Sequence, residues 1–221
     1  MKRKFLLTSP FLALSLFISQ MAHAVDTTLT LSGQITPVAC TIAIANGGAF
    51  QFGDIVASSL NKTSETVMPA QTSTLSIQCN APTMLGLGAT DNRLGTEAVG
   101  SVGGASDSTK FGVGRDSDGE AIGAYHMLMV NMTNNGTPIE SMRTLTSGAT
   151  WEQSTPNGVI YDGAPTILTG FSLPGTGNAV APIESFQATM NVPLFIAPSD
   201  RLLLTQAINI DGSSTIELVY F

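Results

Sequence analysis

The amino-acid sequence predicts an all-β protein, a β-sandwich enlarged by long loop insertions. Short apolar runs alternate with clusters of Gly, Ser, Thr, Asn and Asp, and 22 of the 221 residues are glycine. Charged residues make up only 11 % of the chain, and no long stretch beyond the amino-terminal segment repeats apolar residues with the helical period. Apolar runs of this length between turn residues are typical of strands, so we expect one enlarged sandwich domain.

Segment 1–24 has the pattern of a secretory signal peptide. Three basic residues at 2–4 precede a mostly apolar run over 5–19, and Ala22-His23-Ala24 places small residues at the cleavage site. A transmembrane anchor is the alternative, but the run is shorter than the roughly 20 apolar residues that cross a bilayer. We therefore expect cleavage after Ala24, and a chain that is exported to the periplasm rather than embedded in a membrane.

Removal of the signal peptide makes the chain strongly acidic. The mature chain keeps six basic and all sixteen acidic residues, which gives a formal charge of −10. Nucleic acids and anionic lipids are bound by surfaces rich in Lys and Arg, because these residues replace counterions. The composition therefore excludes nucleic acid as an expected partner.

The two cysteines of the chain, Cys40 and Cys79, are expected to form a disulfide. An isolated pair in an exported protein is most simply a disulfide, and closing a loop of this length stabilises the fold by about 4 kcal/mol. A metal site would need more ligands, and His126 is the one histidine of the mature chain. We expect no metal ion and no cofactor.

The first residues after the signal peptide alternate strictly. Over 25–36, Leu29, Leu31, Gly33 and Ile35 share one parity, and Thr or other polar residues hold the other. This alternation predicts a strand with one apolar face. Taken alone, the pattern also fits the first strand of a complete sandwich that pairs within its own chain.

The rest of the chain contains further predicted strands and two polar, loop-rich spans, 91–119 and 133–165. The last strand matters most, because Ile216, Leu218 and Tyr220 alternate with Glu217 and Val219 up to the end of the chain, where an unpaired strand would fray. We expect strands at 38–44, 73–79, 83–89, near Phe111, and at 121–132, 166–173, 184–196, 201–209 and 213–220.

Both ends of the mature chain resemble the pilins of the chaperone–usher pathway. The segment Thr28-Leu-Thr-Leu-Ser-Gly-Gln-Ile-Thr-Pro-Val-Ala-Cys40 is similar to the amino-terminal extensions of type 1 pilus tip subunits, in pattern and in distance to the first cysteine. Thr-Ile-Glu-Leu-Val-Tyr-Phe at 215–221 resembles their last strand, whose penultimate residue is commonly tyrosine. The middle of the chain is longer than in an ordinary pilin and looks like a less characterised branch of fimbrial-like proteins.

The resemblance implies an immunoglobulin-like sandwich that lacks its last strand. Residues 25–37 would be a donor-strand extension and residues 38–221 the pilin-like domain. A periplasmic chaperone would fill the gap first, and the extension of a neighbouring pilus subunit would replace it at the outer-membrane usher, so that the assembled fimbria supports adhesion at the cell surface. The implied donor residues are Thr27, Leu29, Leu31, Gly33 and Ile35, and the implied acceptor strand carries Ile216, Leu218 and Tyr220.

Two other classes of function remain open on the sequence. A free-standing binding module or tip adhesin could stack a sugar on Trp151 or Tyr161, which lie in polar spans. A secreted hydrolase could use His126, but no nucleophile-elbow pattern accompanies it, and a packed or surface histidine is the simpler interpretation. The acidic residues of 116–120 partly resemble a calcium loop, but the downstream bidentate glutamate of such a loop is missing, and an Asp-Gly turn is the simpler interpretation. We expect no catalytic residues.

Overall fold

A computed structural model describes residues 27–35, 37, 39–98 and 107–221. The chain divides into two compact units, residues 1–36 and residues 37–221. The predicted signal peptide, 1–24, lies outside the described residues. In the smaller unit, residues 27–35 have no regular secondary structure. In the described part of the chain, no helix is long and apolar enough to cross a membrane.

The described residues of the larger unit confirm the all-β prediction. They form fourteen strands in three antiparallel sheets and no α-helix. Three short 3-10 segments connect strands: η1 Ala45–Gly48, η2 Ala57–Ser59 and η4 Asp107–Thr109.

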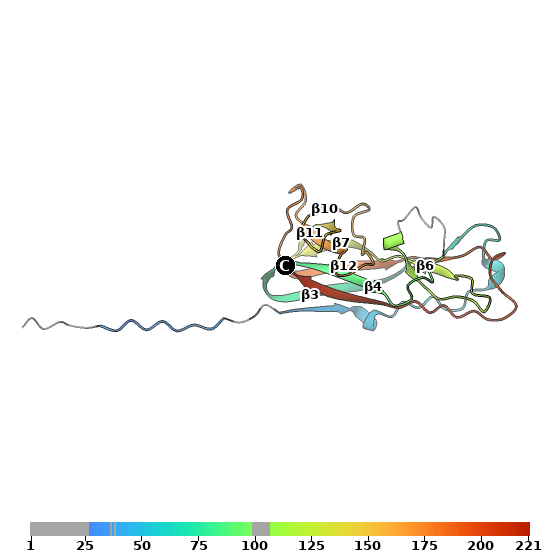
Figure 1. Ribbon diagram of the computed structural model, residues 1–221, viewed down its shortest axis with the longest axis horizontal. Helices are drawn as coiled ribbons and strands as arrows, with labels where there is room; N and C mark the ends of the chain where they lie inside the picture. Colours follow the sequence, from blue (N-terminus) through green and yellow to red (C-terminus); the bar gives the residue numbers. More distant parts are fainter. Residues whose placement is uncertain (1–26, 36, 38, 99–106) are drawn as a thin grey trace, which may run out of the picture. The chain divides into compact units, whose positions relative to one another are not determined.

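The first sheet has β3 and β12 at its centre and β1 at one edge (Figure 1). β3 is long because its apolar residues keep period-2 alternation, with Leu75 and Ile77 fully buried between exposed polar neighbours. In spatial order the sheet contains β1 Cys40–Ile44, β3 Gln71–Thr83, β12 Ile183–Val192, β7 Leu128–Asn134 and β8 Thr137–Pro138.

The second sheet ends on the last strand of the chain, β14 Ser214–Tyr220. β14 pairs antiparallel with β4 Leu85–Asp91 over its whole length, from Ser214 opposite Asp91 to Tyr220 opposite Leu85. The chain end is therefore tied into a sheet, as its alternation predicts. The remaining strands of this sheet are β10 Glu152–Gln153, β9 Glu140–Thr144 and β11 Leu168–Ser172.

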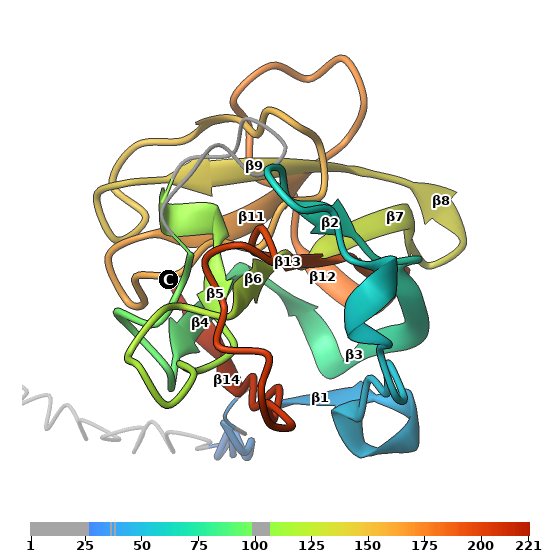
Figure 2. The ribbon, with the colours of Figure 1, turned by 90° about the vertical axis from the view of Figure 1, so that its right-hand side faces the viewer.

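One hydrophobic core joins the first two sheets. Phe171 on β11 and Phe186 on β12 are both fully buried, and their ring centroids are 4.6 Å apart. Leu75, Ile77, Leu85 and Leu87 from both sheets belong to the same cluster. This core fixes the two sheets, and so the edge strands β1 and β14 whose neighbourhood forms the candidate site (Figure 2).

A third sheet forms a second, smaller core. Ile122, Leu194 and Ile196 are buried there, with Phe52 and Leu60 packed against them. The sheet contains, in order, β2 Thr66–Val67, β13 Leu194–Ile196, β6 Gly123–Tyr125 and β5 Phe111–Gly112. The span 91–119 contributes Ala98 and Val113 to this core, which therefore orders part of that span.

Several predicted strands differ from the observed ones. Proline has no N–H for a sheet ladder, and Pro193 divides the expected strand 184–196 into β12 and β13. The expected strand 121–132 is divided at the same level into β6 and β7: the His126 N–H donates to the Pro193 carbonyl in the register shared with both neighbouring pairs, but Pro193 has no N–H to return the bond.

Residues 201–209 form turns instead of the expected strand, because Asp116 accepts a hydrogen bond from the Leu203 N–H and Glu120 pairs with Arg201. Within the expected loop 133–165, residues 140–144 form the strand β9. Its Ser141 and Thr144 are buried although they are polar, so the apolar alternation by which strands are predicted is missing from this segment.

Replacing Phe171 with alanine should lower the free energy of unfolding by about 3–5 kcal/mol, because a large cavity opens where the two sheets meet. Urea unfolding followed by fluorescence measures the change. Leu173→Ala is the matched control, since Leu173 follows the same strand but is 44 % exposed. Equal losses in the two variants would contradict the assignment of Phe171 to the core.

Candidate functional site

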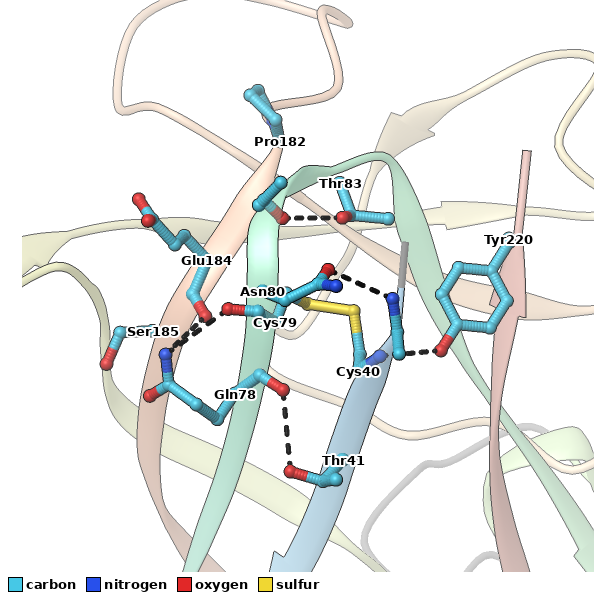
Figure 3. Close-up of a disulfide and its surroundings, with 12 residues drawn as sticks. Cys40, Thr41, Gln78, Cys79, Asn80, Thr83, Pro182, Glu184, Ser185 and Tyr220 are labelled. Atoms are coloured by element: carbon cyan, nitrogen blue, oxygen red, sulfur yellow. Dashed lines mark hydrogen bonds between the residues drawn. A yellow bond between two sulfur atoms is a disulfide. The ribbon is translucent and has the colours of Figure 1, made fainter. Parts of the chain in front are cut away.

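A disulfide holds the edge strand β1 against β3. Cys40 and Cys79 are directly opposite each other in the antiparallel register, and their Sγ atoms are bonded (Figure 3). The predicted disulfide is thus confirmed. It closes a sequence separation of 39 residues and fixes the position of the first strand of the larger unit.

Asn80 reinforces the same attachment. Its side-chain Oδ1 accepts a hydrogen bond from the Ala39 N–H at 3.0 Å, and its Nδ2 donates to the Pro37 carbonyl at 3.4 Å. The Asn80 N–H also donates to the Ala39 carbonyl at 3.1 Å. The chain is therefore fixed at the point where the larger unit begins.

The carboxyl-terminal residue anchors β14 on the other sheet. The Phe221 N–H donates to the Met84 carbonyl, and the Phe221 ring lies 5.2 Å from the Trp151 ring, centroid to centroid. A Cβ at Gly170 of β11 would lie 2.5 Å from the Trp151 ring, so this ring can occupy its position only beside a glycine. Trp151 is thus used in packing the chain end.

β1 and β14 each present one unpaired backbone edge. β1 pairs with β3 alone and β14 with β4 alone in the described residues. Residues in an antiparallel strand turn their N–H and C=O alternately to the two sides. Because the Ala39 carbonyl faces β3, the backbone groups of Cys40, Ile42 and Ile44 face the free edge.

The same argument fixes the free edge of β14. The Ser213 carbonyl accepts from the Asn92 N–H, and the Phe221 N–H donates to Met84, so the odd-numbered residues face β4. The backbone groups of Ser214, Ile216, Leu218 and Tyr220 therefore face away from their sheet. These free groups are what an additional strand would pair with.

A side chain bridges the two free edges at one end. The Cys40 N–H donates a hydrogen bond of 3.2 Å to the Tyr220 hydroxyl, which reaches from β14 toward β1 (Figure 3). The two backbones are thus joined through a tyrosine side chain rather than by a ladder of hydrogen bonds. Figure 2 shows β1 and β14 on the same side of the larger unit.

Beyond this bridge lies a groove of about 700 Å³, which we call the edge groove. Ile42 and Ile44 of β1 form one wall and Ile216 of β14 contributes to the other. These three side chains are only partly buried although they pack against the main core. Most side chains that line the groove are apolar, while Asp211, Ser213, Ser214 and exposed backbone groups add polar surface of similar extent. The floor of the groove contains Tyr125, Met127, Met190, Val192 and Leu194.

The far half of the groove is formed by residues that the sequence did not single out. After β1 the chain turns sharply through Asn46, Gly47 and Gly48, all with positive φ, a conformation that glycine and asparagine tolerate best. Phe50 and Phe52 then line the groove. Their alternation in Phe-Gln-Phe is the sequence signal that could have indicated this wall.

Tyr125 places a polar atom on the floor of the groove. Its ring stacks on Phe111 at a centroid distance of 5.3 Å. Burial raises the pKa of the Tyr125 hydroxyl to about 12, so the group is a neutral hydrogen-bonding hydroxyl at physiological pH. The floor therefore combines this hydroxyl with aliphatic and thioether groups, and Asp211, Ser213 and Ser214 add polar groups at the β14 side, a mixture suited to a chain that alternates apolar and polar residues.

The predicted acceptor residues occupy three different places. Ile216 lines the groove, Leu218 packs against the main core, and Tyr220 forms the bridge with its ring 48 % exposed. The sequence placed all three residues on one parity of one strand. The tertiary structure decides that one lines the groove, one packs against the main core and one bonds to Cys40.

The predicted donor residues lie in the smaller unit. Leu29, Leu31 and Ile35 are 87 %, 86 % and 99 % exposed, and residues 27–35, with Thr27 and Gly33 among them, form no strand. Residues 27–35 thus form no strand within this chain, and their pairing as a donor strand in a neighbour's groove stays a prediction. A strand requires a partner for its N–H and C=O groups.

The other candidate sites have structural explanations. The Asp116 carboxylate accepts hydrogen bonds from the N–H groups of Asp118, Glu120 and Leu203, which lower its pKa, the Leu203 bond most. Tyr161 is buried and bonded to the Ser154 hydroxyl. No cluster of three or more potential metal ligands occurs among the described residues.

His126 is buried beside Phe195, with the two rings in edge-to-face contact at 5.1 Å. Its Nε2 has no hydrogen-bond partner among the described residues. Burial, and secondarily the charge of Lys110, lower the pKa of His126, while a hydrogen bond with the Thr109 backbone opposes them. It lies between β6 and β7 rather than within a strand.

The chain is similar to one protein family and to one individual protein. The family described as "Protein of unknown function (DUF1120)" matches residues 29–126, a region that includes most of the alternating segment and both cysteines. "Protein GltF" of Escherichia coli (strain K12) is 27 % identical over 243 residues, covering 95 % of this chain and 94 % of that protein.

The double variant Cys40→Ser/Cys79→Ser should unfold with a free energy about 4 kcal/mol lower than that of the parent chain, because the 39-residue loop is no longer closed in the unfolded state. Urea unfolding measures this loss, and reducing the parent chain should reproduce it. An unchanged unfolding midpoint in both experiments would refute a stabilising role for the disulfide.

His126 should make the fold less stable in mild acid. Its folded pKa is lower than its unfolded value, so its contribution is fully present above the unfolded pKa of about 6.5 and declines as pH falls below that value. Unfolding free energies at about pH 7.5 and about pH 5.5 should differ more in the parent chain than in His126→Gln. The same pH dependence in both proteins would rule out this contribution.

Proposed function

We propose that this protein is a structural subunit of a bacterial surface fimbria, assembled by donor-strand complementation. In this proposal, residues 27–37 of one copy or of a related subunit fill the edge groove of the next. The observation that carries the proposal is the pair of unpaired sheet edges, β1 and β14, which flank a groove with a mainly apolar floor in a chain that also carries an exposed alternating segment.

Strand addition suits the chemistry of the edge groove. An added strand would pair its backbone with Ile42 and Ile44 on one side and with Ser214 and Ile216 on the other, and its alternate side chains would enter the groove. These backbone groups supply affinity for any extended chain, while the apolar floor selects alternating sequences. Two five-stranded sheets with a shared core agree with an immunoglobulin-like sandwich that lacks the strand between β1 and β14.

The donor side of the proposal rests on three exposed aliphatic residues. Burying Leu29, Leu31 and Ile35 from water is worth about 1.5–3 kcal/mol each, or about 5–9 kcal/mol before ordering costs. Backbone hydrogen bonds add to that value. Gly33 would let the donor backbone come close to the groove at the one position on this face that has no Cβ.

The proposal also requires assembly proteins and an oxidising compartment. A free edge beside a groove with a mainly apolar floor invites aggregation, so a periplasmic chaperone would cover the groove until a donor strand arrives at an outer-membrane usher. The disulfide agrees with an oxidising compartment such as the periplasm. The assembled fimbria would lie at the cell surface and support adhesion.

Supplying the donor strand in cis tests the proposal. One variant lacks residues 25–38, and a second carries that segment after Phe221 on a flexible Gly/Ser linker. We expect the second variant to melt about 10–30 °C higher than the first, because burial of three aliphatic residues adds several kcal/mol. Circular dichroism during heating measures both melting temperatures.

Two changes within the appended segment provide the control. Leu31→Asp should abolish most of the gain, because it places a charge in the groove, whereas Thr30→Asp should retain it on the opposite face of the strand. If the truncated protein is already as stable as the complemented one, the sandwich is complete. The alternative of a free-standing binding module would then replace the proposal.

A further inference from the structure

We infer that Tyr220 sets the register of the strand that fills the edge groove, by closing the groove at the level of Cys40. This inference rests on the proposed function, because it assumes that a strand enters the groove. It adds a specificity-determining residue at the end of β14 and states which part of each edge the added strand pairs with. It is carried by four observations on the two edge strands.

The bridge occupies one backbone N–H group on the free edge of β1. The Cys40 N–H faces the free edge of β1 and would be the first group there to pair with an added strand. It donates instead to the Tyr220 hydroxyl at 3.2 Å. An added strand can therefore pair with β1 at Ile42 and Ile44 but not at Cys40 while the bridge is present.

The open space ends at the same level. The groove is lined by Ile42 and Ile44 on β1 and by Ser214 and Ile216 on β14, and neither Cys40 nor Tyr220 belongs to its lining. From these residues the groove extends away from the bridge toward Phe52. The bridge thus lies at one end of the groove rather than across its middle.

Both ends of the bridge are held in place. Cys40 is bonded to Cys79 on the side away from β14, and Ala39 before it is clamped by Asn80. Tyr220 pairs with Leu85 of β4, and the next residue, Phe221, donates its N–H to Met84. The backbones at both ends are therefore fixed, and the hydrogen bond from the Cys40 N–H holds the half-exposed Tyr220 ring between them, in the path of an entering strand.

A register stop adds to the register information in the donor sequence. Shifting a strand by one residue moves its apolar face out of the groove, but shifting it by two residues keeps that face inside. Leu29, Leu31, Gly33 and Ile35 share one parity, so parity alone permits two-residue slips, and Gly33 is the one residue of this face that distinguishes the registers. A wall at one end selects one of these registers, since a donor that slips toward Cys40 collides with the Tyr220 ring.

Photo-crosslinking of a synthetic peptide to the purified full chain tests the inference. The peptide has the sequence of residues 25–37 and carries a diazirine analogue of leucine at position 29 or 35, and mass spectrometry identifies the labelled residues. In the parent chain we expect labels within 42–52 and 210–218, and none at 40–41 or 220–221. Tyr220→Phe removes only the hydroxyl, and it should raise labelling at 40–41 or 220–221 by several-fold.

The matched control is Tyr161→Phe, which removes a hydroxyl hydrogen bond to Ser154 from the core instead. It should leave the labelling pattern of the parent chain unchanged, even if it lowers the melting temperature. A parent chain labelled at 40–41 or 220–221 would overturn the register stop, whether or not the variants fold. An unchanged pattern in Tyr220→Phe, or the same shift in Tyr161→Phe, would also overturn it.

The peptide distinguishes this inference from the proposed function. A peptide that labels no groove residue of the parent chain contradicts strand addition itself, and with it the register stop. A peptide that labels the groove and also the residues beyond the bridge leaves strand addition in place and removes only the role of Tyr220.

Discussion

β1 has a partner on one side only, and the edge groove depends on its being held against β3. A strand of five residues that is paired along a single edge is weak by itself. The disulfide joins β1 to β3 at directly opposed residues, and Asn80 holds the chain just before the strand. Without this attachment Ile42 and Ile44 could leave the core, and the groove would lose one wall. The covalent bond thus maintains an open edge that pairing alone would not maintain.

An open sheet edge beside apolar side chains favours aggregation, and most proteins shorten, charge or cover such edges. Ile42, Ile44 and Ile216 pack against the core and yet remain partly exposed, and the backbone groups between them have no strand partner among the described residues. Such a surface gains free energy when an extended apolar chain covers it. Two methionines in the floor, Met127 and Met190, add side chains that adapt to an occupant. Incompleteness on this side is consistent with a protein whose fold is finished by another chain.

The long insertions are ordered by buried carboxylates as well as by the second core. Asp91 accepts hydrogen bonds from the N–H groups of Arg93 and Gly112 at 2.8 and 2.7 Å, while burial, the largest influence, raises its pKa. Asp116 similarly joins its own turn to Leu203. In both places a carboxylate replaces missing strand partners for backbone N–H groups. The acidic composition is therefore partly structural, and the calcium-like spacing of 116–120 is explained by these bonds.

The sequence by itself determined the β class, the disulfide, and the alternation of the two chain ends, because each depends on local parity or on the simple count of two cysteines. It also indicated that the last strand must be paired. Only the tertiary structure decided that Pro193 and His126 interrupt predicted strands, and that buried Ser141 and Thr144 belong to one. The same holds for the edge groove, whose walls come from Ile42, Phe50 and Ile216. Residues 42 and 50 are far from residue 216 in the chain, and no local pattern states which sheet edges will face each other.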